Sequence, residues 1–332
     1  MIIPTYNRAS MIVRAVLSVL VAVSPGDEVI VVDDGSTDET ELRLGPFADR
    51  IRYVKAANGG AGKARNRGLD EARFPLVAFL DSDDEWTSDR LLLGRRLLAA
   101  RPDVLFCFSD LGLRHAGLPD QGGGLVGWHS DRRSWDEILA PGVWYSGIAE
   151  LPPGRPDFRV HVGSLYVPLL HGPYVAVQTL LVRREGAGSG FRFAEDLPTY
   201  EDWECVARLA RAGNGAYLDA VTAWQWGHDA PRVTDANELQ RATARARMIE
   251  RVWGSDGEYL ARDGDRVARV LREQRLLQAK WLLRHGRGRE ARAALQLVHQ
   301  APASYRLLAS MPGWLTKEVL AWRLALRRAI IG

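Results

Sequence analysis

Leu76-Val77-Ala78-Phe79-Leu80-Asp81-Ser82-Asp83-Asp84 places three carboxylates directly after a short apolar run. Such a run is typical of a buried strand, so the acidic cluster is expected at the strand's end. Carboxylates in that position can hold a divalent cation whose open positions are filled by substrate phosphates. The stretch therefore predicts an α/β enzyme that depends on a nucleotide.

Strands and helices alternate around this stretch. The sequence predicts strands at 1–3, 28–32, 51–55, 76–80 and 104–109, and helices at 12–23, 65–72 and 88–100. Because parallel strands need helical crossovers between them, this alternation predicts a largely parallel sheet covered by helices.

The regular pattern stops between residues 112 and 173, which include Gly122-Gly123-Gly124 and Pro152-Pro153. A long irregular insertion in a compact domain is usually a functional loop or poorly ordered. After it, the sequence predicts a strand at 175–182, a helix at 200–212 and an edge or closing strand at 222–226.

From about residue 231 the chain reads as helical. Helices are expected near 236–253, 265–285, 288–299 and 314–331. The sequence thus predicts two domains, residues 1–230 and a helical C-terminal extension at 231–332.

Charge is unevenly spread between these parts, although the whole chain carries only +3. Residues 236–332 hold 19 Lys and Arg against 9 Asp and Glu, and the remainder holds 25 against 32. A basic segment can contact nucleic acid or an anionic membrane, but basic helices are more often simply solvated. We expect no nucleic-acid partner.

Two cysteines, Cys107 and Cys205, lie in apolar surroundings without the paired spacing of metal ligands. They suit buried, reduced thiols in a cytoplasmic protein. The sequence has no run of 18 apolar residues, and its start lacks the features of a secretion signal. We therefore expect neither a membrane span nor secretion.

Polar motifs follow three of the predicted strands: 33–38, 58–62 and 81–84. Ligands of open α/β sheets bind beyond the carboxyl ends of the strands, so these motifs are expected at one edge. The first is also compatible with a turn and helix cap, and the second with a loop that needs positive φ angles. The third motif, 81–84, indicates a functional site, because three crowded carboxylates repel one another unless a cation or proton lies between them.

Together these motifs resemble glycosyltransferase family 2, the inverting nucleotide-sugar transferases with the GT-A fold. The segments that carry the resemblance are 2–8, 32–40, 58–68, 81–91, 183–185 and 201–203, and it covers about residues 1–230. It implies an α/β GT-A fold, with a mostly parallel central sheet flanked by helices and an α-helical C-terminal extension.

The resemblance also implies roles for individual residues. Those implied in binding the nucleotide or donor are Pro4, Tyr6, Asn7, Asp34, Gly60, Lys63, Arg65, Asp81 and Ser82. Of these, Tyr6 and Asp34 would contact the nucleobase and Asp81 the ribose. Asp83 would hold Mg²⁺ or Mn²⁺ at the diphosphate, with Asp84 and His228 as further candidate ligands. Asp202 would be the general base.

The implied reaction moves a sugar from a nucleotide-sugar donor, with UDP favoured, to a hydroxyl of a glycan or lipid-linked glycan. A positioned carboxylate can take the proton of the attacking hydroxyl, which suits the role of Asp202. A divalent cation can neutralise the nucleoside diphosphate that leaves. The family setting is cell-envelope or exopolysaccharide synthesis.

The last predicted helix, residues 314–331, is amphipathic and basic. Its apolar stripe comprises Leu315, Val319, Trp322, Leu326 and Ile330. It could lie in the headgroup region of an anionic membrane, as a peripheral contact on the cytoplasmic face. It could equally pack on its own domain or on a second copy of the chain.

Two other functional classes are compatible with part of the pattern. A binding module that has lost catalysis could use the helical tail as a scaffold, although Asp83 and Asp202 are both present. A phosphate-accepting receiver or a haloacid-dehalogenase-like phosphatase also places carboxylates around Mg²⁺. The spacing argues against that class, since the phosphatase motif needs Asp-x-Asp-Gly-Thr and a receiver has no need of Asp202.

Overall fold

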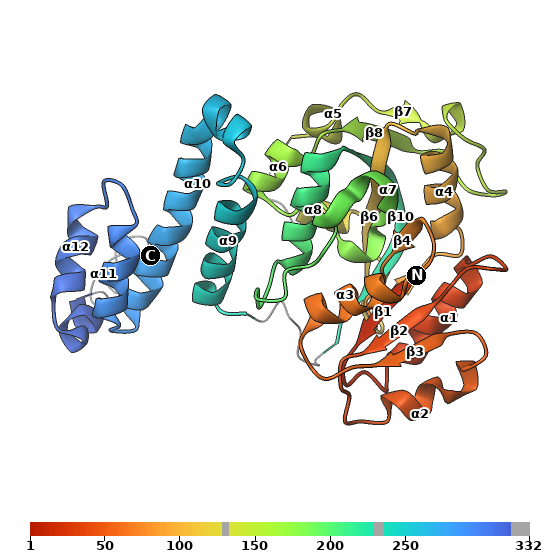
Figure 1. Ribbon diagram of the computed structural model, residues 1–332, viewed down its shortest axis with the longest axis horizontal. Helices are drawn as coiled ribbons and strands as arrows, with labels where there is room; N and C mark the ends of the chain where they lie inside the picture. The colour runs from red at the N-terminus through yellow and green to blue at the C-terminus, as the bar shows by residue number, and fades with distance from the viewer. Residues whose placement is uncertain (128–132, 229–235, 320–332) are drawn as a thin grey trace. The chain divides into compact units, whose positions relative to one another are not determined.

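The computed structural model describes residues 1–127, 133–228 and 236–319. The chain divides into two compact units (Figure 1). The first comprises Met1–Leu197 and Glu201–Ala230, and the second Pro198–Tyr200 and Pro231–Gly332.

A small parallel sheet begins the first unit. It consists of β1 (Ile2–Thr5), β2 (Ile30–Asp33) and β3 (Arg52–Lys55), joined in that order. Helices α1 (Ile12–Ala22), α2 (Thr40–Leu44) and α3 (Ala61–Glu71) connect or follow these strands. The strand, helix, strand pattern read from the sequence is therefore present here, and α3 packs on β1 and β2.

Close packing between α3 and β1 depends on Gly68. A Cβ atom at this position would lie 2.4 Å from Cγ2 of the buried Ile2. We expect Gly68→Ala to lower the free energy of unfolding by about 1–3 kcal/mol, because added atoms in a packed core force strain. Denaturant titration measures this change in the free energy of unfolding. Gly45→Ala is the control, since Gly45 has helical dihedrals and no atom near its missing Cβ, and equal effects would contradict the packing argument.

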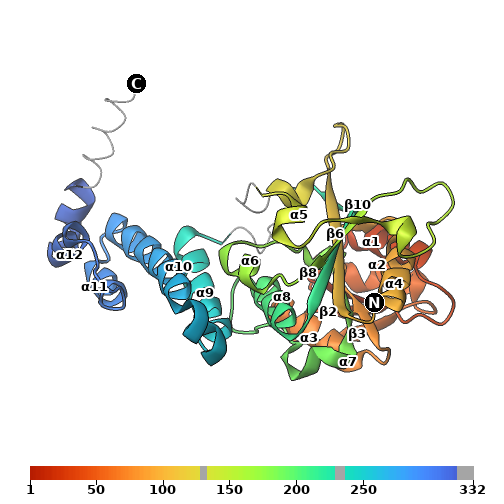
Figure 2. The same cartoon turned by 90° about the horizontal axis from the view of Figure 1, so that it is seen from above.

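A second, mixed sheet forms the larger part of the unit. Its order is β4 (Leu76–Ala78), β9 (Leu181–Arg183), β6 (Val104–Arg114), β10 (Asn214–Trp226), β8 (Arg159–Gly163) and β7 (Val143–Trp144), and β5 (Glu85–Trp86) also pairs with β10. A parallel bridge between Ile2 and Phe79 joins the two sheets. The long strands β6 and β10 run side by side in Figure 2.

The expectation of a mostly parallel sheet holds for β1 to β3 and for the pair β6 and β10. The other pairings in the second sheet are antiparallel. The reason is that β5, β8 and β9 run opposite to the strands beside them, and of these only β9 overlaps a predicted strand, the one at 175–182. The α/β class itself is unchanged.

The strand predicted at 222–226 is present as the end of β10, but its predicted place at the edge of the sheet was wrong. The strand β10 spans 13 residues and lies inside the sheet, between β6 and β8. Its first half contains small residues that do not look like strand formers. They fit because the neighbouring side chains are large: a Cβ on Gly215 would lie 2.6 Å from the ring of Phe106.

The prediction of an irregular stretch at 112–173 was only partly right. Short elements lie within it: the end of β6, α5 (Trp135–Ile138), β7, β8 and α6 (Tyr166–His171). Each is too short to give a readable period. The strand expected at 175–182 is also shorter, because a 3₁₀ turn occupies Val177–Thr179 before β9.

The remaining helices of the first unit are α4 (Arg90–Ala100), α7 (Arg184–Ala187) and α8 (Glu201–Ala212). Short 3₁₀ turns lie at Gly45–Phe47, Gly124–Gly127, Tyr145–Gly147 and Gly188–Gly190. Both α4 and α8 were predicted within one or two residues of these bounds.

The second unit is helical, as predicted. Its helices are α9 (Glu238–Val252), α10 (Gly257–Arg284), α11 (Gly288–Gln296) and α12 (Ala303–Ser310). A core that includes Leu282, Leu283, Leu295 and Leu308 joins the last three. The short helix α12 was not predicted, and α10 begins earlier than expected.

Of the helix expected at 314–331, residues 313–319 are helical and the rest lies outside the described residues. Among the residues that the structure describes, no helix combines the length and apolar character needed to cross a bilayer.

Candidate active site

The acidic turn that follows β4 directs its three carboxylates to three different partners. Its chain reverses through a hydrogen bond from the Asp84 amide to the Asp81 carbonyl, 3.1 Å. Asp81 meets Arg65, Asp83 meets His228, and the buried Asp84 accepts a 3.3 Å hydrogen bond from the backbone amide of Trp226. The cluster is therefore three separate contacts that share one turn.

Asp83 and His228 form the part of the site that could hold a cation. Asp83 Oδ2 lies 2.8 Å from His228 Nε2 and 3.7 Å from Arg8 Nε. The other ring nitrogen of His228, Nδ1, is buried and has no hydrogen-bond partner within the described residues. The side chains of Asp83 and His228 are 18% and 10% exposed, so both are partly shielded from water.

No group of three or more His, Cys, Asp or Glu side chains suited to a metal ion occurs in the described part of the chain. The Asp83 carboxylate could hold Mg²⁺ or Mn²⁺, which keep open positions for substrate phosphates, and the His228 imidazole could add a nitrogen ligand to Mn²⁺. Asp84 faces the backbone of β10, which favours Asp83 and His228 over Asp84 as ligands.

Arg65 joins the acidic turn to the start of α8. Its guanidinium donates 2.8 Å to Glu201 Oε1 and 2.7 Å to Asp81 Oδ1. Burial alone would lower the pKa of Arg65, but Asp81 and Glu201 outweigh it and raise that pKa. Burial raises the pKa of Asp81, and Arg65 opposes the rise. The Asp81 side chain keeps 30% exposure, so it remains open to a ligand.

Asp202 lies in the first turn of α8, next to Glu201. Its Oδ1 accepts a 2.7 Å hydrogen bond from the Trp203 amide. Burial raises the pKa of Asp202 to about 7; the charge of Glu201 adds to the rise, and Arg65 opposes it. A carboxyl with a pKa near neutrality can accept a proton efficiently at physiological pH.

Asp34 binds the glycine loop that precedes α3. Its Oδ1 accepts 2.9 Å from the Gly59 amide and its Oδ2 accepts 2.7 Å from the Gly60 amide. Burial raises its pKa, and these two hydrogen bonds and Lys63 oppose the rise. The Lys63 side chain lies over Gly59, where a Cβ would come within 2.3 Å of Lys63 Cδ. The two loop amides are thus engaged by Asp34 itself.

The segment after β1 contacts the turn after β2. Asn7 has a φ of 50° and accepts 2.8 Å from the Thr37 amide, and its own amide donates 2.9 Å to Ser36 Oγ. Tyr6, the residue before Asn7, is 45% exposed, whereas Pro4 is buried in β1. Ser82 is buried within the acidic turn.

The structure thus brings the predicted residues together in separate groups. These are Asn7 with the turn after β2, Asp34 with Gly60 and Lys63, Arg65 with Asp81, and Asp83 with His228. The pair at 183 and 184 is not at this site: Arg183 donates to the carbonyl of Leu98 and Arg184 to that of Ala72, at the ends of α4 and α3.

Sequence reasoning missed three contacts at the site. Glu201 was placed at a helix start, but not against Arg65, which is 136 residues away in sequence. Arg14 donates 2.8 Å to the Asp83 carbonyl and lies over the ring of Trp226. One signal could have identified Arg14, because it is the only charged residue in α1.

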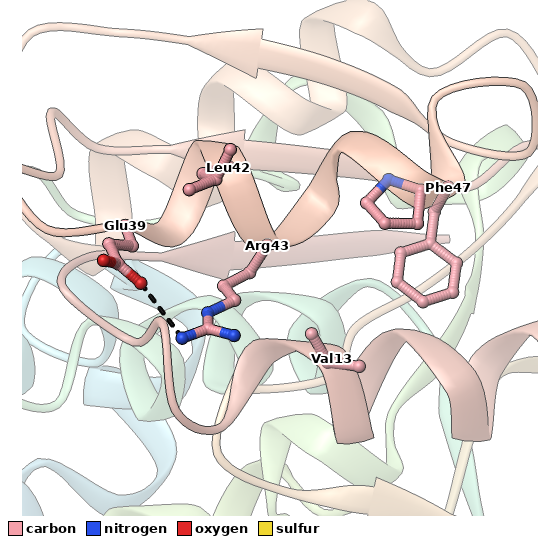
Figure 3. A pocket seen from close by; sticks show the side chains of 6 residues that line it. Val13, Glu39, Leu42, Arg43 and Phe47 are labelled. Carbon is pink, nitrogen blue, oxygen red and sulfur yellow. Dashed lines mark hydrogen bonds and ion pairs between the residues drawn. The ribbon is translucent and has the colours of Figure 1, made fainter.

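A shallow pocket of about 480 Å³ lies elsewhere, between α1, α2 and the turn after α2 (Figure 3). Its lining residues are Val13, Glu39, Leu42, Arg43, Pro46 and Phe47. None of the predicted site residues lines it. The candidate active site is therefore defined by the polar contacts at the strand ends and not by this pocket.

Comparison with known proteins agrees with the motifs. The profile of "Glycosyl transferase family 2" matches residues 1–111. Among curated relatives, the succinoglycan biosynthesis protein ExoW of Rhizobium meliloti is 42% identical over 98 residues, which are 27% of this chain and 31% of ExoW. The chain spans only 14% to 37% of the length of the curated relatives that it matches.

Two solved structures are similar over most of the chain. S. aureus TarS 1–349, in complex with UDP-GlcNAc, has a TM-score of 0.55 at 18% identity and covers 95% of this chain and 87% of its own. The mannosyltransferase PcManGT from Pyrobaculum calidifontis, in complex with GDP-Man and Mn²⁺, has a TM-score of 0.52 at 18% identity and covers 98% and 79%. The expected fold class is confirmed, because the chain has the GT-A fold of these structures, and its residues 1–111 match glycosyltransferase family 2.

Proposed function

We propose that this chain is a metal-dependent, inverting glycosyltransferase, with residues 1–230 as its catalytic domain and 231–332 as a helical extension. The observation that carries the proposal is the environment of Asp202. This carboxyl has a pKa near 7 and shares one charge network with Asp81, through Glu201 and Arg65. The charge of the same buried cation thereby acts on a proton acceptor and on a donor-side carboxylate.

The donor is a nucleotide sugar, and UDP is the favoured nucleotide. Tyr6 and Asp34 would contact the base and Asp81 the ribose, and the exposure of Tyr6 and Asp81 supports these roles. Asp34 also fixes the glycine loop that carries Gly60 and Lys63. The UDP-GlcNAc bound to TarS supports UDP, while the GDP-Man bound to PcManGT makes GDP the main alternative.

Asp83 and His228 would be the protein ligands of the bound Mg²⁺ or Mn²⁺. Such an ion supplies positive charge that offsets the charge growing on the departing diphosphate. The Mn²⁺ in the PcManGT complex supports this assignment.

Asp202 takes the proton of the acceptor hydroxyl as that oxygen attacks the anomeric carbon. Glu201 is engaged by Arg65 and does not serve as a second carboxylate at the sugar. One displacement with one carboxylate base inverts the anomeric centre, whereas a retaining hydrolase needs two carboxyl groups that flank the bond.

The acceptor is a glycan or lipid-linked glycan, in cell-envelope or exopolysaccharide synthesis. The name of ExoW, a succinoglycan biosynthesis protein, supports this setting. We place the enzyme in the cytoplasm, with a peripheral membrane contact or an oligomer contact through residues 314–331. Within the described residues, Trp314 is 68% exposed, which supports such a contact.

Calorimetry with UDP, GDP, dTDP and CDP, each with and without Mn²⁺, tests the donor assignment. We expect one nucleotide to bind with a dissociation constant that falls at least tenfold when Mn²⁺ is present, because the diphosphate completes the coordination of the ion. Asp83→Ala should remove the Mn²⁺ effect. If none of the four nucleotides binds, the transferase proposal fails, and a scaffold that has lost catalysis becomes the better explanation.

A further inference from the structure

The acidic turn is held from outside by a cluster of two arginines and two tryptophans. On one side, Arg14 of α1 donates 2.8 Å to the backbone carbonyl of Asp83. The same guanidinium lies 4.3 Å from the ring centre of Trp226, and its Nε is 3.1 Å from Glu85 Oε1. Arg14 therefore contacts the turn, the strand that follows it and the end of β10.

The opposite side of the cluster fixes β5 and β10 to each other. Glu85 and Trp224 are register partners in the two strands. Arg114 lies 4.2 Å from the ring centre of Trp224 and 2.9 Å from Glu85 Oε2. Trp226, in turn, donates its backbone amide to Asp84. The turn is thus attached to rigid elements at each end, and only Arg14 reaches the carbonyl of Asp83 among the contacts found in the described residues.

A displaced Asp83 backbone would carry its carboxylate away from His228, which it meets at 2.8 Å. Small divalent cations require near-ideal ligand geometry, so a shift of one ligand weakens binding. Groups that orient metal ligands typically change metal affinity by about 10–100-fold when removed. A guanidinium can donate to a carbonyl and pair its charge with a nearby carboxylate while its flat face stacks on an indole, and a lysine ammonium cannot stack in this way.

We propose that Arg14 is a positioning residue that fixes the Asp83 carboxylate for cation binding. This inference rests on the proposed function of Asp83 and goes beyond it, because Arg14 donates to the backbone carbonyl of Asp83 and would act on the ion only through that residue. The Arg14 side chain is 33% exposed, so its role is orientation of the turn and not burial of charge.

The test measures Mn²⁺ affinity by the electron paramagnetic resonance signal of free Mn²⁺, in the presence of saturating UDP. We expect Arg14→Met to weaken Mn²⁺ binding by about 10–100-fold. The affinity for UDP without Mn²⁺ should stay as in the wild type. Arg14→Lys, which keeps the charge but loses the planar fork, should also weaken Mn²⁺ binding.

Arg159→Met is the matched control. Arg159 also stacks on an indole, 4.2 Å from the ring centre of Trp144, and donates 2.9 Å to a backbone carbonyl, that of Gly142. It has no contact with the acidic turn among the described residues. We expect the Arg159→Met variant to bind Mn²⁺ with wild-type affinity. Its melting temperature should be close to that of Arg14→Met.

Each outcome has a separate meaning. Wild-type Mn²⁺ affinity in Arg14→Met, or in Arg14→Lys if the methionine variant does not fold, overturns the role of Arg14. Equal losses in Arg14→Met and Arg159→Met also overturn it, because the effect would then be general. If the wild type and Asp83→Ala bind Mn²⁺ equally, the metal assignment of the proposed function fails instead.

Discussion

Asp202→Asn is expected to lower the rate of sugar transfer by about 10²–10⁴-fold, because a positioned general base contributes that much. Asparagine keeps the size of the side chain and can still accept from the Trp203 amide, but it cannot take a proton. Binding of the donor nucleotide should remain within about twofold of wild type, since the role proposed for Asp202 is on the acceptor side. Release of nucleoside diphosphate in the presence of acceptor measures the rate, and calorimetry measures binding.

Asp70→Asn is the control for this substitution. Asp70 lies on α3 and is about half exposed, paired with Arg192. Its variant should transfer sugar at the wild-type rate. An Asp202→Asn variant that keeps more than half of the wild-type rate would contradict the assignment of the base.

The pH dependence follows from the same carboxyl. Because the pKa of Asp202 is raised to about 7, the rate should rise with pH through this value as the carboxyl loses its proton. The raised pKa also affects stability: the favourable contribution of the protonated form is complete below the ordinary pKa of 3.8 and is lost as pH rises through about 7. Asp202→Asn should therefore be more stable than the wild type above pH 7 and equal to it in acid.

The part of the site that could be predicted lies where local sequence decides the structure. Asp34 and Asp81 each follow a strand that is apolar and regular, so their place at a sheet edge could be read from the chain. The contact of Asp83 with His228 needed the family resemblance, because 145 residues separate them.

The remainder depends on packing that a local pattern does not contain. β10 lies inside the sheet, where Gly215 leaves room for the ring of Phe106, and neither residue indicates this position alone. Glu201 looks like an ordinary acidic residue at a helix start, where its negative charge would interact favourably with the helix dipole. Only the fold brings it to Arg65 and makes it part of a buried ion pair.

Arg65→Met is expected to lower the free energy of unfolding by about 3–5 kcal/mol, which is typical when one partner of a buried ion pair is removed. Arg65 and Glu201 are 6% and 7% exposed, so water cannot replace the lost partner. Urea titration measures the change in the free energy of unfolding. The dependence of this free energy on urea concentration should be compared between the variant and the wild type. Arg67→Met is the matched control: its pair with Glu71 lies on the same helix with Arg67 53% exposed, and should contribute about 0–1 kcal/mol.

A double variant, Arg65→Met with Glu201→Gln, separates charge from packing. If the loss arises from an uncompensated carboxylate, removing the charge of Glu201 should restore part of the stability. The same double variant should also bind donor more weakly than wild type, because Asp81 has lost the cation that orients it. A double variant no more stable than Arg65→Met would contradict the charge argument and assign the loss to packing against Phe193.

The charge of Arg65 should also reach the proposed base. Asp81, Glu201 and Asp202 are three carboxyl groups around one guanidinium, and Arg65 opposes the rise in the pKa of Asp202. Any transfer that remains in Arg65→Met should therefore need a higher pH than the wild type, with the rising limb of the rate profile moved above about pH 7. If the rising limb of the rate profile stays at the same pH, Arg65 stabilises the fold but does not change the pKa of Asp202.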